Sequence, residues 1–161
     1  MSFQVTNCIG PLLDLSPNGL KVTKKGNDGW NTTIRGTRQV TSGKHIWTVK
    51  TSHKFAFVGV APSNIDLSQY RIFEKFGYFI YCYNSHIYSG PPLKYTDHYF
   101  GSAEVKEVSV VLDCDHGTVG FIADGKDLGV AFNGILKDNY SLCICLSNQN
   151  ETVELLNYKE L

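Results

Sequence analysis

The chain has 161 residues, 42% hydrophobic and 19% charged, a balance typical of one globular domain with its own core and unlike a disordered or fibrous chain. Fifteen Lys and Arg residues offset fifteen Asp and Glu residues, so no net charge attracts nucleic acid or an anionic membrane. Five cysteines, an odd count without a Cys-x-x-Cys pair, argue against a disulfide framework or a zinc site, so we expect one domain, residues 1–161, without metal or cofactor.

The first third of the chain contains a basic run and a strand pattern. Lys21, Lys24 and Lys25 are the only clustered cations, and we expect them to be solvated at a strand end rather than to bind phosphate. Residues 44–50 alternate between two faces, and Trp47 shares its face with His45 and Val49. The pattern predicts a strand with Trp47 as a core anchor.

The next run, Phe55–Ala61, is apolar on both faces, as in a strand at the centre of a sheet. Its Gly59 predicts the close approach of a neighbouring backbone. Residues 63–76 show weak helical spacing, which leaves a short helix and an irregular loop as alternatives. In the helical interpretation, Ser63 and Asp66 cap a short turn, with Leu67, Tyr70 and Phe73 on one side.

The stretch 77–92 is the densest aromatic segment of the chain. Tyrosines occur on both alternating faces of residues 78–85, so at least one tyrosine-rich face meets something other than a single core. Tyrosine suits interfaces because its large ring loses little entropy on ordering and its hydroxyl finds a partner. We therefore single out Tyr83 and Tyr88 as surface contacts, with docking of the whole strand as the alternative.

The last third predicts three consecutive strands around residues 108–112, 119–123 and 128–132. Asp124-Gly125 favours a tight hairpin between the second and third of these strands. Cys143 and Cys145 share one face of a further strand, where we expect them to be buried. With turn signals throughout, the chain is predicted to be all-β, built from two facing sheets.

Catalytic and metal-binding motifs are absent from the sequence. Asp113 and Asp115 resemble a carboxylate pair, but their place at a hairpin end predicts that they accept hydrogen bonds from turn amides. The five histidines lie in no recognisable motif, and neither a nucleophile elbow nor a phosphate-binding loop is present. A hydrolase would require a histidine within hydrogen-bond reach of a loop serine or cysteine.

Three segments, in order and correctly separated, resemble the SPRY domain family over about Leu13 to Leu156. They are TSGKHIWTVK (Thr41–Lys50), FVGVA (Phe57–Ala61) and LDCDHGTVGFIADGKDLGVAF (Leu112–Phe132). The resemblance implies a bent β-sandwich of two antiparallel sheets, no catalytic activity, and recognition of linear peptides within adaptors and scaffolds. The SPRY domains of SPRY/SOCS-box adaptor proteins look closest, because Leu20–Gly36 aligns with theirs without a gap and ends in the same Ile-Arg-Gly.

The resemblance to those adaptors also implies a peptide site. Its arginine position is Lys24, its proline position is Gly26, its tyrosine is Tyr88, and its Val-Trp-Gly loop falls near residues 147–149, so only the tyrosine is identical. Together with the basic run and the aromatic segment, the predicted peptide-binding residues are Lys24, Lys25, Gly26, Tyr83, Tyr88, Ser147, Asn148 and Gln149.

The sequence therefore predicts a non-catalytic module that binds a short peptide of a partner protein through its loops. The alternatives are a structural subunit that docks by a sandwich face and a carbohydrate-binding β-sandwich. Because no basic start precedes a long apolar run, we expect a cytoplasmic or nuclear protein. We also expect a monomer, alone or within a larger complex, and no SOCS box or RING finger follows the last predicted strand.

Overall fold

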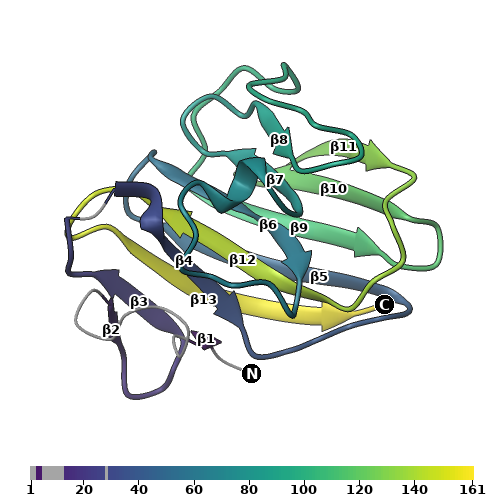
Figure 1. Cartoon of the computed structure of the whole chain (residues 1–161). Helices are drawn as coiled ribbons and strands as arrows, with labels where there is room; N and C mark the ends of the chain where they lie inside the picture. Colours follow the sequence, from purple (N-terminus) through teal and green to yellow (C-terminus); the bar gives the residue numbers. More distant parts are fainter. Residues whose placement is uncertain (1–2, 5–12, 28) are drawn as a thin grey trace.

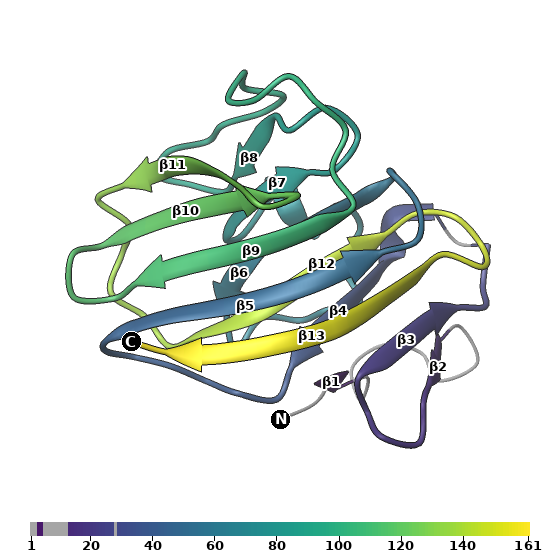
Figure 2. The same cartoon turned by 180° about the vertical axis from the view of Figure 1, so that it is seen from behind.

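The computed structural model describes residues 3–4, 13–27 and 29–161, so Cys8 lies outside the described residues. Two antiparallel sheets pack face to face (Figure 1). In spatial order, the six-stranded sheet consists of β1 (Phe3–Gln4), β4 (Thr32–Gly36), β12 (Tyr140–Leu146), β6 (Ala56–Pro62), β7 (Tyr78–Tyr81) and β8 (Ile87–Ser89). The seven-stranded sheet consists of β11 (Lys126–Asn133), β10 (Thr118–Ala123), β9 (Glu107–Asp113), β5 (Lys44–Thr51), β13 (Thr152–Glu160), β3 (Lys21–Lys24) and β2 (Leu13–Leu15), and lies in front in Figure 2.

The core between the sheets follows the predicted alternation. In β5, every second side chain is buried, and Trp47 is only 1% exposed. The consecutive strands β9, β10 and β11 form the predicted meander, and Asp124 and Gly125 both take positive φ in the turn before β11. Such a turn matches the right-handed twist of its flanking strands. The predictions of the fold, the Trp47 anchor and this hairpin are confirmed.

β6 is a central strand, as predicted, between β12 and β7. Gly59 is required there because a Cβ atom at this position would lie 1.9 Å from the carbonyl oxygen of Tyr78 and 2.8 Å from the Cα of Phe79. No side chain fits at those distances. The predicted close approach of a neighbouring backbone at Gly59 is therefore confirmed.

The segment 63–76 covers the outer face of the six-stranded sheet. It contains no α-helix but a single 3₁₀ turn, η3 (Ile72–Glu74), so the irregular alternative is the observed one. Leu67 and Phe73, within this segment, are fully buried. Tyr70 is 51% exposed, so it does not share their buried side as the helical interpretation predicted. Figure 1 shows η3 in front of this sheet. The sheet is thus covered on both faces, which explains why β6 is apolar on both sides.

Residues on the covered outer face include polar groups that hold segment 63–76 in place. Arg35 of β4 is 6% exposed, and its guanidinium donates hydrogen bonds to the carbonyl oxygens of Ser63 and Ile65. Cys143 and Cys145 of β12 lie on this same face and are fully buried, as predicted. No helix among the described residues is long and apolar enough to cross a membrane.

Candidate functional site

Three connections meet at the end of the sandwich where β5 ends. They are residues 25–27 and 29–31, between β3 and β4, residues 52–55, between β5 and β6, and residues 147–151, between β12 and β13. Lys24 donates its amide to the Glu151 carbonyl at 2.8 Å, and Ser52 donates its amide to the Thr152 carbonyl at 3.0 Å. Figure 1 shows these connections together at the left end of the molecule. We call this region the loop end.

Five aromatic rings follow one another from the covered outer face toward the loop end, three of the four successive pairs being stacked and Tyr81–Tyr83 tilted, and we call them the aromatic ladder. Successive ring centroids are 3.5 Å apart for Phe73 and Phe57, 4.2 Å for Phe57 and Tyr81, 5.7 Å for Tyr81 and Tyr83, and 5.9 Å for Tyr83 and Phe55. Exposure increases along the series, from fully buried Phe73 to Tyr83, which is 46% exposed. The ladder therefore begins in a rigid core and ends on the surface.

Trp30 packs its edge against the buried half of the ladder. Its ring centroid lies 5.0 Å from Phe57 and 5.2 Å from Phe73, and the ring is half-buried. The Trp30 carbonyl accepts a hydrogen bond from the Arg71 amide at 3.1 Å, which ties the loop to segment 63–76. The Trp30 centroid also lies 6.3 Å from that of half-buried Tyr81, so Trp30 adds aromatic surface to the ladder next to Tyr81.

Two ionisable side chains lie buried beneath the loop end. Lys24 is fully buried, and its ammonium donates a hydrogen bond to the Gly29 carbonyl at 2.8 Å. Glu151 is 1% exposed, and its Oε1 accepts a hydrogen bond from the Asn148 amide. Its Oε2 is buried without a hydrogen-bond partner among the described residues. Lys24 and Glu151 therefore support the loops from below and do not present their charges to a partner.

The ionisation of buried Glu151 is expected to lower the free energy of unfolding as pH rises. Burial raises the pKa of Glu151 above its ordinary value of 4.5, against hydrogen bonds from the Asn148 and Ser147 amides and the charges of His53 and Lys24. The folded state therefore binds this proton more tightly than the unfolded state. As pH rises from 4.5 through the folded pKa of Glu151, the proton is lost and the free energy of unfolding of the protein falls.

Urea unfolding of the wild type and Glu151→Gln, at a series of pH values between about 4 and 8, measures this slope. Glu151→Gln should flatten the slope, and Glu154→Gln, at an exposed position of β13, should leave it unchanged. An identical slope in the wild type and Glu151→Gln would assign the pH dependence to another group.

The predicted site residues divide into an exposed and a buried set. Tyr83 is exposed at the end of the aromatic ladder, and the connections beside it carry exposed Lys25, Asn148 and Gln149 with half-buried Gly26 and Ser147. The Lys25 ammonium lies 3.9 Å from a carboxylate oxygen of Asp14. The buried set is Lys24 and Tyr88.

The sequence prediction did not include Trp30, Tyr70 and Tyr81, although Trp30 is one of only two tryptophans.

Tyr88 differs from the prediction of a surface contact, because it is only 7% exposed. Its ring meets those of Phe57 and Phe73 edge-on, with centroids 4.7 Å and 5.6 Å away. Burial, and then the charge of Asp97, raise the pKa of Tyr88 to about 12. A ring in this position supports the aromatic ladder from behind. Docking by the bare 78–83 strand is also not supported, since Phe79 is fully buried.

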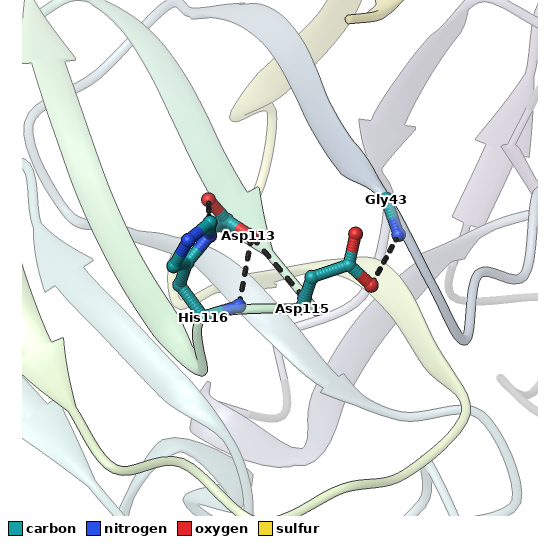
Figure 3. Close-up of polar contacts among 4 residues, drawn as sticks. All are labelled: Gly43, Asp113, Asp115 and His116. Carbon is teal, nitrogen blue, oxygen red and sulfur yellow. Dashed lines mark hydrogen bonds and ion pairs between the residues drawn. The ribbon is translucent and has the colours of Figure 1, made fainter.

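The opposite end of β5 holds the Asp113 to His116 turn (Figure 3). Asp113 accepts hydrogen bonds from the amides of Asp115 and His116 at 3.1 and 3.0 Å, and Asp115 accepts one from the Gly43 amide. Burial acts to raise the pKa of Asp113, but these hydrogen bonds and the His116 charge outweigh it, so the pKa is lowered. The prediction that both carboxylates satisfy turn amides is confirmed.

Among the described residues, one histidine side chain lies within hydrogen-bond reach of a loop serine hydroxyl, because Ser52 Oγ is 2.7 Å from His53 Nδ1. Among the described residues, no ion pair or hydrogen bond joins His53 to a carboxylate, so the base has no orienting third group. Ser52 Oγ also accepts the Thr152 amide at 2.8 Å, which fits a loop-closing role. The described residues hold no cluster of three His, Cys, Asp or Glu placed to bind a metal ion.

The family model described as the SPRY domain matches residues 44–159. The SPRY domain of human HERC1 superimposes with a TM-score of 0.71 at 18% identity, over 97% of this chain and 94% of that one. The TRIM65 PSpry domain superimposes with a TM-score of 0.74 at 12% identity, over 97% and 91%. No curated protein matches in a sequence search.

Proposed function

Because the chain belongs to the SPRY family, whose members are generally protein-interaction modules, we propose that it binds a short linear peptide of a partner protein at the loop end. Tyr83, Lys25, Gly26 and residues 147–149 would contact the peptide. Lys24 and Tyr88 would hold the contacting loops and rings in place from within. The module has no catalytic role in this proposal.

The observation that carries the proposal is the exposed half of the aromatic ladder. Tyr83 is 46% exposed, and its ring centroid lies 5.7 Å from that of half-buried Tyr81, which lies 6.3 Å from that of half-buried Trp30. Tyrosine and tryptophan dominate the binding energy of many interfaces because they bury large area at low entropic cost. Tyr81 stacks on buried Phe57, and Trp30 makes T-shaped contacts with Phe57 and Phe73, so both rings are fixed before a partner arrives, which lowers the ordering cost further.

The polar connections beside the rings supply the second element of a peptide site. Asn148 and Gln149 are exposed amides, and the loop that carries them is fastened to Lys24 by the Asn150 amide at 2.8 Å. Exposed amide side chains can pair with the backbone of an extended peptide. An aromatic anchor with a polar rim is the usual anatomy of a specific interface.

The closeness of Leu20–Gly36 to SPRY/SOCS-box adaptors leads us to extend the proposal to an adaptor or scaffold role in the cytoplasm or nucleus. The departures at Lys24, at Gly26 and in the 147–149 loop imply a peptide motif different from that of those adaptors. In this chain, aromatic surface from Trp30 and Tyr83 would take the place of the tryptophan that the 147–149 loop lacks.

A random peptide display selection against the purified chain tests this function. One enriched motif is expected, and Tyr83→Ala should weaken its binding by about 2 kcal/mol while leaving the unfolding transition unchanged. Tyr99→Ala is the matched control, because Tyr99 is 68% exposed but stands outside the aromatic ladder. Without an enriched motif, or with equal losses for the two variants, the loop end would not be the peptide site.

A further inference from the structure

The exposed end of the aromatic ladder already carries a cation from the chain itself. The ammonium of Lys54 lies 5.1 Å from the ring centroid of Tyr83 and 5.3 Å from that of Phe55. Both distances are within the roughly 6 Å range of a cation–π interaction. The two rings stack at an interplanar angle of 15°, and the one ammonium lies within this range of both. The ring pair therefore has the geometry of a cation site.

The contacts of the Lys54 ammonium that the described part of the chain shows are those with the two rings. Among the described residues, no carboxylate forms an ion pair with it, and its side chain is only half-buried. An ammonium is compact and strongly hydrated, so it gains little from a partly exposed ring face. A cation of lower hydration and flat shape would gain more at the same rings.

Stacked guanidinium groups occur elsewhere in this chain. The Arg71 guanidinium carbon lies 5.0 Å from the centroid of the Phe73 ring, at the buried end of the ladder, and that of Arg38 lies 4.5 Å from the centroid of the Tyr158 ring. A planar, weakly hydrated guanidinium stacks on aromatic faces better than an ammonium does. The Tyr83 and Phe55 rings offer the same kind of face without an arginine of their own.

We propose that Tyr83 and Phe55 form a subsite for a guanidinium, supplied by an arginine of the bound peptide, which displaces the ammonium of Lys54. The inference rests on the proposed function and adds the chemistry of one peptide residue. Displacement removes one positive charge from the subsite as the arginine brings another. Arg71, at the buried end of the ladder, is paired with Glu74, whose carboxylate lies 2.5 Å from its guanidinium.

N-acetyl-arginine amide, titrated into the full chain and followed by the NMR shifts of the Phe55 ring, tests the subsite without any peptide partner, because this ring remains in every Tyr83 and Lys54 variant. We expect saturable binding that Tyr83→Leu abolishes and Tyr83→Phe retains. Lys54→Ala should raise the affinity about two- to fivefold, because the competing cation is gone. N-acetyl-citrulline amide, which is flat but uncharged, should not bind, and Tyr99→Leu should leave arginine binding unchanged.

Equal shifts with the citrulline compound, or an unchanged affinity in Lys54→Ala, would overturn the subsite. The two proposals fail separately. Selected peptides that depend on Tyr83 but contain no arginine would overturn the subsite and leave the peptide function standing. Binding of the arginine compound, tightened by Lys54→Ala, would support the subsite even if peptide selection found nothing.

Discussion

Replacing Gly59 with alanine is expected to lower the free energy of unfolding by about 3 kcal/mol or more, at the upper end of the overpacking range. The added methyl would lie 1.9 Å from the carbonyl oxygen of Tyr78. This oxygen belongs to the backbone of β7, which is paired to β6, so the clash cannot be relieved by a side-chain rotation. The two strands would have to separate, and both carry rings of the aromatic ladder.

Urea unfolding of Gly59→Ala checks this result, and Gly36→Ala is a matched control in β4 of the same sheet. At Gly36 the nearest atom to an added Cβ is a side-chain carbon of Leu142 at 3.3 Å, which can shift slightly. We expect the control to cost less than about 1 kcal/mol, as surface and mild packing changes do. Similar losses for the two variants would mean that β7 moves freely relative to β6.

The buried face of one strand and the central position of another could be predicted because single residues signalled them. Alternation around Trp47 identified the buried face of β5, and the Gly59 run identified a central strand. These signals are local, since a strand has a period of two and a glycine marks its own backbone contact. The family resemblance then added the arrangement of the two sheets.

The covering of the outer face could not be predicted in the same way. A run that is apolar on both sides indicates two covered faces but does not identify what covers them. Here segment 63–76 does so with a single 3₁₀ turn and an exposed Tyr70, a layout without a sequence period. The first ring of the aromatic ladder, Phe73, belongs to this segment. The full ladder could therefore not be predicted from the sequence.

The burial of Lys24 was indicated by the strand period, but its positive charge indicated the opposite. It stands two residues after Val22 in β3, and the period of a strand places the two side chains on the same, inward face. The positive charge favoured an exposed position instead. A buried lysine needs compensating contacts, which the Gly29 carbonyl and the nearby Glu151 carboxyl provide at long sequence range. Such contacts become visible only in the folded chain.

Replacing Tyr88 with alanine is expected to lower the free energy of unfolding by about 3 kcal/mol or more, as for other buried aromatic truncations. The ring is 7% exposed and packs against Phe57, Phe73 and, at 6.1 Å, Tyr81. Tyr88→Phe keeps this packing and loses only the hydroxyl, so it should cost about 1 kcal/mol. Calorimetric or urea unfolding of both variants measures the difference.

Tyr88→Ala and Tyr83→Ala should therefore have opposite profiles. Truncation of Tyr83 is expected to reduce peptide affinity with little loss of stability, because nearly half of its surface is free. Truncation of Tyr88 is expected to lower the free energy of unfolding. Peptide affinity should fall only to the extent that the ladder rings packed against Tyr88 become less well fixed. If Tyr88→Ala instead kept the stability of the wild type and abolished binding, the ring would have to contact the peptide directly. Segment 63–76 would then have to open to admit a partner, and the binding surface would extend from the loop end onto the outer face of the six-stranded sheet.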